Sequence, residues 1–309
     1  MISYLAWRLS AAVLVVLAVT TTCFVALHLS GDPVLMLVPA GAPPEVIENT
    51  RRALGFDQPF LTQFGTFVVQ ALTGQFPDSI VTGRPALELV LSRVPATVDL
   101  AVVATILGLV VGLLLGWLAG GVRSGLVRGL ATSVTSLLQA TPSFFIAVVA
   151  VLVIAVNLRL LPTGGSGSPA QLVLPSTVLA LSIAPSIARV FRGTLVGVRD
   201  EDFVFALRAR GVRESRIVGR HVLPNSSLPL VTVLGMEFGA LLGGTVIIEQ
   251  IFSWPGVGRL IVDSIFQKDY PVVLAGVIFL SAALAVLNII VDLLYVVIDP
   301  RVRLAGGSR

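Results

Sequence analysis

Six apolar segments, each longer than 20 residues, constrain this chain more than any other feature of its sequence. They are Leu9–Leu29, Val98–Gly120, Ala131–Val156, Leu172–Val196, Leu228–Ile248 and Val272–Ile298. A helix of ~20 apolar residues is long enough to span the hydrocarbon core of a bilayer. Charged residues are only 12% of the chain, whereas soluble domains average about 25%. We therefore predict an all-α polytopic membrane protein with six transmembrane helices.

The first apolar segment has one alternative interpretation, a cleaved signal peptide. Its apolar run is longer than the central region of a signal peptide, and Ser30-Gly31-Asp32 does not resemble a cleavage site of small residues. We interpret it as the first transmembrane helix, with Arg8 holding the N-terminus inside. The expected domains are thus residues 1–29, an extracytoplasmic subdomain over residues 30–97, and a transmembrane core over residues 98–309.

The polar region of residues 30–97 contains two short helical patterns. Pro43 and Pro44 precede Glu45–Leu54, which Gly55 closes, and a second helix is predicted over Gln63–Leu72. Apolar residues are interspersed throughout, which favours a compact subdomain over a disordered linker.

Basic residues are distributed unequally between the two sides of the predicted membrane. Fourteen of the 21 lie on the side of both termini and seven on the other, four of these in the long first loop. Because short cytoplasmic loops carry the excess of arginine and lysine, we expect both termini to be cytoplasmic. Twenty arginines against the single Lys268 favour a bacterial origin, and hence the bacterial plasma (inner) membrane.

The longest charged interruption between apolar segments is Arg199–Asn225, which the charge distribution also places in the cytoplasm. Acidic residues 200–202 are expected to cap a first short helix, because negative charge stabilises the positive end of a helix. Gly211 is expected to stop that helix, since glycine tolerates the left-handed conformation of a C-terminal cap. A second helix is predicted over Glu214–Val222, ending before Pro224. The alternative is a solvated loop without a function of its own.

This stretch resembles the EAA-type coupling loop of ABC importer permeases. The residues that carry the resemblance are Ala206, Gly211, His221, Leu223 and Pro224, with nine residues between the glycine and the histidine. The surrounding DFVFALRARGV is similar to the version in the dipeptide/oligopeptide permease family. Phe205 and Leu207 depart from the pattern, which has Glu and Ala there.

Further matches to that family occur in the expected order along most of the chain. They are GDP at Gly31–Pro33, LGFDQP at Leu54–Pro59, TPSFF at Thr141–Phe145, LPTGG at Leu161–Gly165, EQIFSWPGVGRL at Glu249–Leu260 and DPRVR at Asp299–Arg303. The resemblance implies a permease subunit of an ATP-driven importer of peptides, with nickel or another small solute as the alternative.

The resemblance also implies partners and a coupling site. The partners are a second homologous permease, two ABC ATPase domains that bind ATP and magnesium, an extracytoplasmic solute-binding protein and the lipid membrane, without nucleic acid. The residues expected to contact the ATPase are Phe203, Ala206, Leu207, Arg208, Gly211, His221 and Pro224.

Two stripes of glycine at four-residue intervals predict close helix packing, because small residues let helix backbones approach each other in a membrane. They consist of Gly108, Gly112, Gly116 and Gly120 in one segment and Gly235, Gly239 and Gly243 in another. Chance in a glycine-rich chain is the alternative.

A few polar residues interrupt the apolar segments. A charge near the bilayer centre costs ~3 kcal/mol, so such residues face protein or water. Glu237 is a candidate for the solute pathway or for a structural hydrogen bond, and the latter is favoured for Asp292. Gln139 and Asn288 are further pathway candidates.

The sequence does not support catalysis or a bound metal. A G-x-x-x-x-G-K-[ST] phosphate loop is absent, so ATP hydrolysis is assigned to the partner ATPase, and no cofactor is expected in this chain. Cys23 is the single cysteine, and His28 and His221 are predicted on opposite sides of the membrane, which excludes a Cys/His metal cluster. A stand-alone secondary transporter is the remaining alternative, but the sequence shows neither clear internal repeats nor an ion relay.

Overall fold

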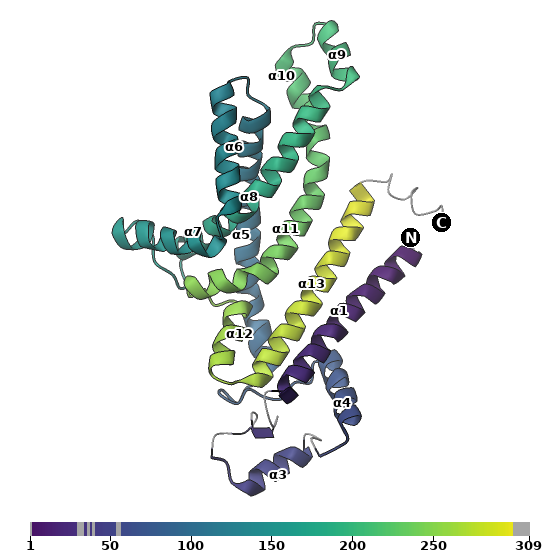
Figure 1. The fold of residues 1–309 in the computed structure, drawn as a ribbon, viewed down its shortest axis with the longest axis vertical. Helices are drawn as coiled ribbons and strands as arrows, with labels where there is room; N and C mark the ends of the chain where they lie inside the picture. Colours follow the sequence, from purple (N-terminus) through teal and green to yellow (C-terminus); the bar gives the residue numbers. More distant parts are fainter. Residues whose placement is uncertain (1, 30–33, 36–37, 39–40, 54–56, 299–309) are drawn as a thin grey trace. The chain divides into compact units, whose positions relative to one another are not determined.

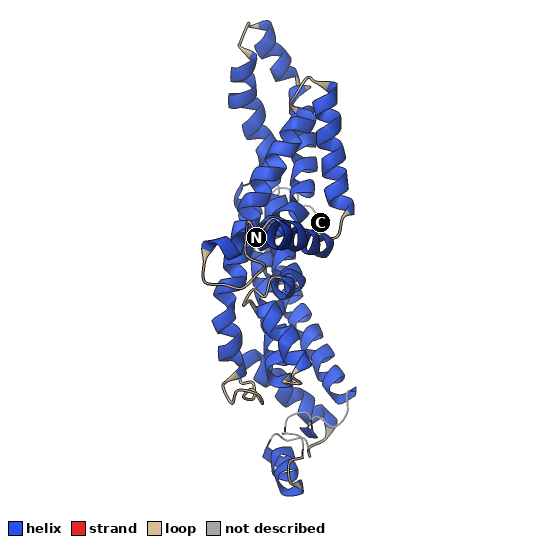
Figure 2. Cartoon of the chain, turned by 90° about the vertical axis from the view of Figure 1, so that its left-hand side faces the viewer, coloured by secondary structure: helices blue, strands red, loops and turns tan. Residues whose placement is uncertain are grey.

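The computed structural model describes residues 2–29, 34–35, 38, 41–53 and 57–298. All regular structure in these ranges is helical, as Figures 1 and 2 show. Five of these helices are long and apolar enough to cross a membrane. A sixth span is obtained if Gly125–Ala140 and Ser143–Asn157, bent by 100° at the intervening break, count as one. The predicted all-α membrane fold is confirmed.

Three of the family matches fall wholly or partly outside the described residues. They are Gly31–Pro33, the first three residues of Leu54–Pro59, and Asp299–Arg303.

The chain divides into two compact units, one made of Met1–Thr97 with Pro255–Ile289 and the other of Val98–Trp254 with Ile290–Arg309. The helices of the first unit are α1 (Ile2–Leu29), α3 (Pro44–Ala53), α4 (Phe60–Thr73), α12 (Val257–Phe266) and most of α13 (Tyr270–Ile298). Its α1 is joined to α4 by an aromatic cluster. Phe24 is buried, and its ring centroid lies 5.2, 5.3 and 5.4 Å from those of Phe60, Phe64 and Phe67.

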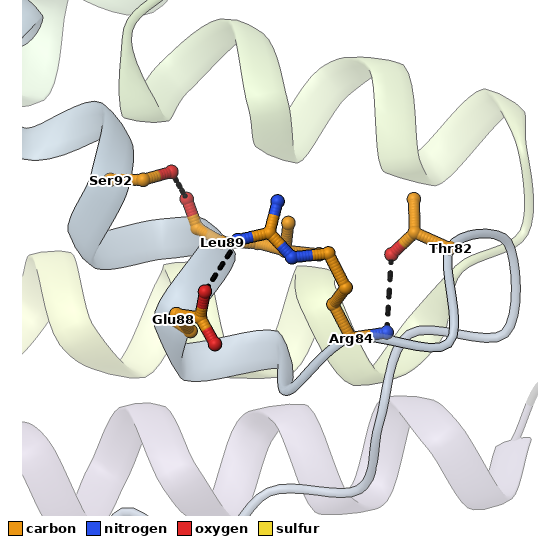
Figure 3. A network of polar contacts seen from close by, with 5 residues as sticks. All are labelled: Thr82, Arg84, Glu88, Leu89 and Ser92. Carbon is orange, nitrogen blue, oxygen red and sulfur yellow. Dashed lines mark hydrogen bonds and ion pairs between the residues drawn. The ribbon is translucent and has the colours of Figure 1, made fainter.

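The start of α5 (Ala86–Gly120) belongs to this first unit. The helix begins 12 residues before the predicted span, because apolar positions such as Ala86 and Val90 bury themselves against Val257, Ile261 and Val272 of α12 and α13. An ion pair between Arg84 and Glu88 lies on the surface where α5 begins, as Figure 3 shows.

A buried carboxylate fastens the loop before α5. Asp269 is 3% exposed and accepts hydrogen bonds from Ser79 Oγ at 2.5 Å and from the Ile80 amide at 3.2 Å. Ser79 Oγ in turn accepts one from the Thr82 amide. Because buried polar groups require partners, this network fixes the loop between α4 and α5.

The second unit is organised around α8 (Pro169–Arg199). Besides most of α5, its other helices include α6 (Gly125–Ala140), α7 (Ser143–Ala150), the π-helix η1 (Val151–Asn157) and α11 (Leu223–Ile251). Helix α8 contacts α6, α7 and α11, and its buried side chains include Ile183, Ile187, Phe191 and Leu195. The break between α6 and α7 occurs at Pro142, which has extended backbone and lacks the amide hydrogen that would continue α6. The predicted kink there is confirmed.

Candidate functional site

The charged stretch between the apolar segments forms a helical protrusion, here called the coupling segment (residues 202–224). It contains α9 (Asp202–Ala209), α10 (Glu214–Ile217) and the π-helix η2 (Val218–Val222). In Figure 1, α9 and α10 lie where α8 ends and α11 begins. The segment is therefore carried by two long helices of the second unit.

The two ends of α9 are set by local chemistry. Glu201 occupies the N-cap position with extended backbone, but its side chain makes no capping hydrogen bond, so the acidic residues act through their charge alone. At the other end Gly211 has φ +72°. Its amide donates to the Arg208 carbonyl at 2.9 Å, and the next amide, of Val212, donates to the Leu207 carbonyl at 3.1 Å. The predicted glycine stop is confirmed.

The prediction that the second helix ends before Pro224 is wrong. Helix α10 passes through η2 into α11 with helical backbone at Val222 and Leu223. A π-turn has one more residue per turn and makes room for the proline ring, which otherwise meets the carbonyl four residues earlier. The carbonyl of His221 accepts a hydrogen bond from Asn225 Nδ2 at 2.8 Å. The coupling segment is thus continuous with α11.

The coupling segment has a buried apolar side and an exposed side. Val204, Ile217 and Val222 are fully buried. Phe203 and Phe205 are 40% and 55% exposed. The exposed side also contains five arginines, Arg208, Arg210, Arg213, Arg216 and Arg220.

The remaining predicted coupling residues are placed on the same segment. Ala206, Gly211 and Pro224 are exposed, and Leu207 and His221 are half-buried. The exposed side thus combines aromatic rings with positive charge, which suits a partner surface that has an apolar pocket and acidic residues.

Arg199, the last residue of α8, joins the coupling segment to the end of α5. Its Nη1 donates to the carbonyls of Gly120 and Gly121, both at 3.1 Å, and its guanidinium carbon lies 5.7 Å from the centre of a Trp117 ring. The terminal carbonyls of a helix lack intrahelical partners and carry partial negative charge. Arg199 therefore satisfies these acceptors and holds α8 to α5.

A surface cleft of about 660 Å³ lies beside this anchor. Its lining residues are Trp117, Gly121, Arg123, Arg199, Arg208, Ser215, Val218, Gly219 and Leu223. In the described part of the chain no acidic side chain lines it, and its arginines make the cleft basic as well as partly apolar.

The first glycine stripe lies against α8. A Cβ added at Gly112 would lie 2.7 Å from Ile187 Cβ, and one added at Gly116 would lie 2.8 Å from the carbonyl oxygen of Ala188. Gly108 and Gly120 face Ile183 and Arg192 in the same way. The stripe lets α5 approach the backbone of α8 over three turns.

The second stripe is less uniform. Gly235 faces Val291 at distances too short for a Cβ, whereas Gly239 is half-buried and Gly243 is exposed.

The pathway candidates are distributed over both units. Gln139 lines a cavity of about 260 Å³ between α5, α6 and α8, together with Arg189 and Arg192. Glu237 is half-buried in α11 of the second unit, and Asn288 is exposed on α13 in the first. The side chain of Asp292 lies outside the described part of the chain.

Sequence reasoning missed three features: the anchoring role of Arg199, the Asp269 network and the grouping of Gln139 with arginines. An arginine at a helix end is a weak local signal for carbonyl capping. Its partners here are 78 and 79 residues away, and nothing local specifies them. In the described residues no group of three or more His, Cys, Asp or Glu is arranged to hold a metal ion.

The fold and the protruding segment define a multi-pass membrane subunit built to engage a partner. A family model described as "Binding-protein-dependent transport system inner membrane component" matches residues 108–304, and the model for the N-terminal part of such components matches residues 1–101. The chain belongs to this family of ABC importer permeases, of the peptide-transporting type. Membership implies ATPase and binding-protein partners.

Similar proteins cover nearly the whole chain. The glutathione transport system permease protein GsiC of Escherichia coli strain K12 is 34% identical over 304 residues, which are 98% of this chain and 99% of that protein. GsiC of Salmonella typhi is 36% identical over the same shares. Among solved structures, the MetNI methionine ABC transporter in an inward-facing conformation matches with a TM-score of 0.60 at 19% identity, covering 70% of this chain and 98% of that chain. That likeness supports the fold alone.

Proposed function

We propose that the chain forms, with a second homologous permease, the pathway of a peptide importer driven by two partner ATPase domains. The observation that carries the coupling role is the continuity of the coupling segment with α11, together with the Arg199 anchor on α5. A push on α10 would reach α11 through continuous helix, and the Arg199 anchor would pass a movement of the end of α8 to α5.

The exposed side of the coupling segment suits docking on an ATPase. Phe203 and Phe205 present apolar area, and the arginines around them present positive charge. Aromatic residues and arginine dominate the binding energy of protein interfaces, since they bury large areas and pair with carboxylates. ATP-driven closure of the ATPase pair would then move the segment and switch the helices between outward-facing and inward-facing states.

A peptide substrate is favoured by the relatives. GsiC is named for the transport of glutathione, which is a tripeptide, and its similarity extends over the whole chain. A nickel or other small-solute importer of the same family is the second candidate, and a stand-alone secondary transporter is the third. Co-purification of an ATPase with the chain distinguishes the third from the first two.

The remaining parts of the proposal concern orientation and chemistry. Both termini and the coupling segment lie in the cytoplasm, as the arginine distribution favours, and the membrane is the bacterial inner membrane. The chain itself is non-catalytic and holds no cofactor, while the partner ATPases bind ATP and magnesium. An extracytoplasmic binding protein delivers the peptide.

The test is Gly211→Val in the assembled transporter, with Gly197→Val as the matched control. Gly211 has φ +72°, where a β-branched residue is strained, whereas Gly197 lies in α8 with open space around it. We expect Gly211→Val to assemble but to lose most of the peptide uptake per ATP hydrolysed, and Gly197→Val to retain it. Equal coupling in the two variants would contradict the role of the segment. Failure of the wild-type complex to import any peptide would contradict the substrate.

A further inference from the structure

A groove lined by arginine and hydroxyl groups runs between α6 and α8 in the second unit. Its inner part is the 260 Å³ cavity that contains Gln139, Arg189 and Arg192. An outer cleft of about 810 Å³ contains Arg128 and shares three lining residues with the cavity, Thr132, Ser136 and Arg192. The two therefore form one continuous groove.

Helix α6 is amphipathic, although it is part of a candidate membrane span. Arg128, Thr132 and Ser136 follow at four-residue spacing and Gln139 three residues later, so they occupy one face. The opposite face contains exposed leucines, among them Leu126 (75% exposed) and Leu130 (59%). A polar face in a membrane-spanning helix is stable only against protein or water, and here it faces the groove.

The groove is positively charged. Among the residues that the structure describes, no acidic side chain lines the inner cavity or the outer cleft. Arg192 donates to Thr132 Oγ1 at 3.3 Å, and this contact is between a charge and a neutral hydroxyl. Uncompensated guanidinium groups beside hydroxyl donors favour an anion, and above all a carboxylate or phosphate, which arginine binds through two parallel hydrogen bonds.

Two sources could supply such an anion, a transported solute or the headgroup of an anionic lipid. From Arg128 to Gln139 the polar face extends over 11 residues, which is about 16 Å along the helix axis. A headgroup site needs a short polar mouth above an apolar groove for the acyl chains. Here polar side chains recur along the whole groove as far as Gln139, among the alanines Ala119, Ala140 and Ala188, which favours a solute.

We propose that this groove is a water-filled section of the solute pathway, in which Arg128, Arg189 and Arg192 bind the carboxylate of an anionic peptide. The inference rests on the proposed peptide importer and adds a preference for negatively charged solutes. Gln139 supplies an exposed, neutral hydrogen-bonding group at the end of the groove farthest along α6 from Arg128.

The first test is thiol labelling of the assembled transporter in membrane vesicles, starting from the Cys23→Ser background. Gln139→Cys places a thiol in the groove, and Ser166→Cys places one in an exposed loop as the reference. The labelling rate of this chain is compared between an anionic and a cationic methanethiosulfonate. We expect the anionic-to-cationic ratio to be about tenfold higher at position 139 than at position 166, because fixed charges in a cleft raise the local concentration of counter-ions.

The arginine variants identify the source of the preference. Arg189→Gln and Arg192→Gln should each lower the ratio at position 139 toward the reference, and Arg159→Gln, a charge loss outside the groove, should leave it unchanged. Equal ratios at the two cysteines, or no labelling at position 139, would overturn the proposal. Labelling that is blocked when the vesicles contain anionic phospholipid would assign the groove to a lipid headgroup and would overturn it as well.

The second test measures uptake of Ala-Glu and of the nearly isosteric, neutral Ala-Gln. Arg189→Gln and Arg192→Gln should lower the Ala-Glu to Ala-Gln uptake ratio about tenfold relative to the wild type. Because each variant is compared with the wild type, any selection by the binding protein is the same in both and cancels. An unchanged ratio with normal uptake would overturn the anion preference while the proposed function stands. If the wild type imports neither peptide, the proposed substrate fails, and the labelling ratios still decide the character of the groove.

Discussion

The variant Gly116→Ala adds a single methyl group where α5 and α8 touch backbone to backbone. The new Cβ would lie 2.8 Å from the carbonyl oxygen of Ala188 and 3.0 Å from Cδ1 of Phe191. The carbonyl belongs to the interior of α8 and cannot turn aside. To reach the 3.4 Å at which ordinary contact begins, the helices must separate by about 0.6 Å.

A separation of this size has a calculable cost. A gap of 0.5–1 Å removes roughly a quarter to a half of the dispersion energy of each affected contact. Overpacking of this kind costs about 1–3 kcal/mol, and we take ~2 kcal/mol for Gly116→Ala. For a unit of 150–250 residues this corresponds to a fall of roughly 4–8 °C in the unfolding midpoint.

The stripe offers a graded series for the measurement. At Gly108 the added Cβ meets the Cδ1 and Cγ1 atoms of Ile183, which can rotate away, so Gly108→Ala should cost less than Gly116→Ala. Gly193→Ala is the control, because Gly193 lies in α8 with no atom within 4 Å of an added Cβ. That variant should be neutral or stabilise by up to ~1 kcal/mol, since alanine is the better helix former.

The assay is thermal unfolding of the purified transporter in detergent, followed by the loss of the monodisperse peak on size exclusion. We expect midpoints in the order Gly193→Ala, Gly108→Ala, Gly116→Ala from highest to lowest. If Gly116→Ala unfolds at the same temperature as Gly193→Ala, α5 and α8 do not touch at this stripe, and the reasoning is refuted.

Three further predictions concern other parts of the chain. Arg199→Gln removes the charged donor from two carbonyls and should lower the local stability by ~2 kcal/mol. The loss is measured as faster hydrogen exchange in residues 202–222, and unchanged exchange would show that the anchor is dispensable. Asp269→Ala leaves buried Ser79 Oγ without its acceptor and should lower the stability by about 1–3 kcal/mol. We expect faster proteolysis between residues 78 and 85, and protection equal to the wild type would contradict this prediction. Phe24→Ala empties the centre of an aromatic cluster and should lower the stability by about 3–5 kcal/mol. The loss is detected as increased hydrogen exchange in α4, with α8 as the internal control that should not change. Increased exchange in both helices would indicate general unfolding instead.

The membrane class of this protein was predictable because its cause is local. A run of ~20 apolar residues must leave water whatever surrounds it, so the hydropathy pattern alone gave the spans and the intervening polar regions. The stop at Gly211 was predictable for the same kind of reason, since the left-handed backbone it adopts (φ +72°) is a property of glycine itself.

The errors occurred where a local rule met a longer-range constraint. Pro224 indicated a helix end, and by propensity alone that inference was sound. The structure instead widens one turn into a π-helix and continues into α11, which joins the coupling segment rigidly to the membrane core. Ile217, just before the π-helix, and Val222, its last residue, are both buried. Their burial stabilises this continuous helix, and helix propensity takes no account of burial.

The amino-acid sequence by itself therefore determined which segments are apolar and where the charged segment interrupts them, and it indicated the tight contact of the first glycine stripe. Tertiary structure decided which groups meet: Arg199 with the carbonyls of Gly120 and Gly121, and Gln139 with Arg189 and Arg192. The physical reason is that hydrophobicity and backbone preference belong to single residues and their neighbours. A hydrogen bond or a charged groove belongs to residues far apart in the chain, and only the packing of the helices brings them together.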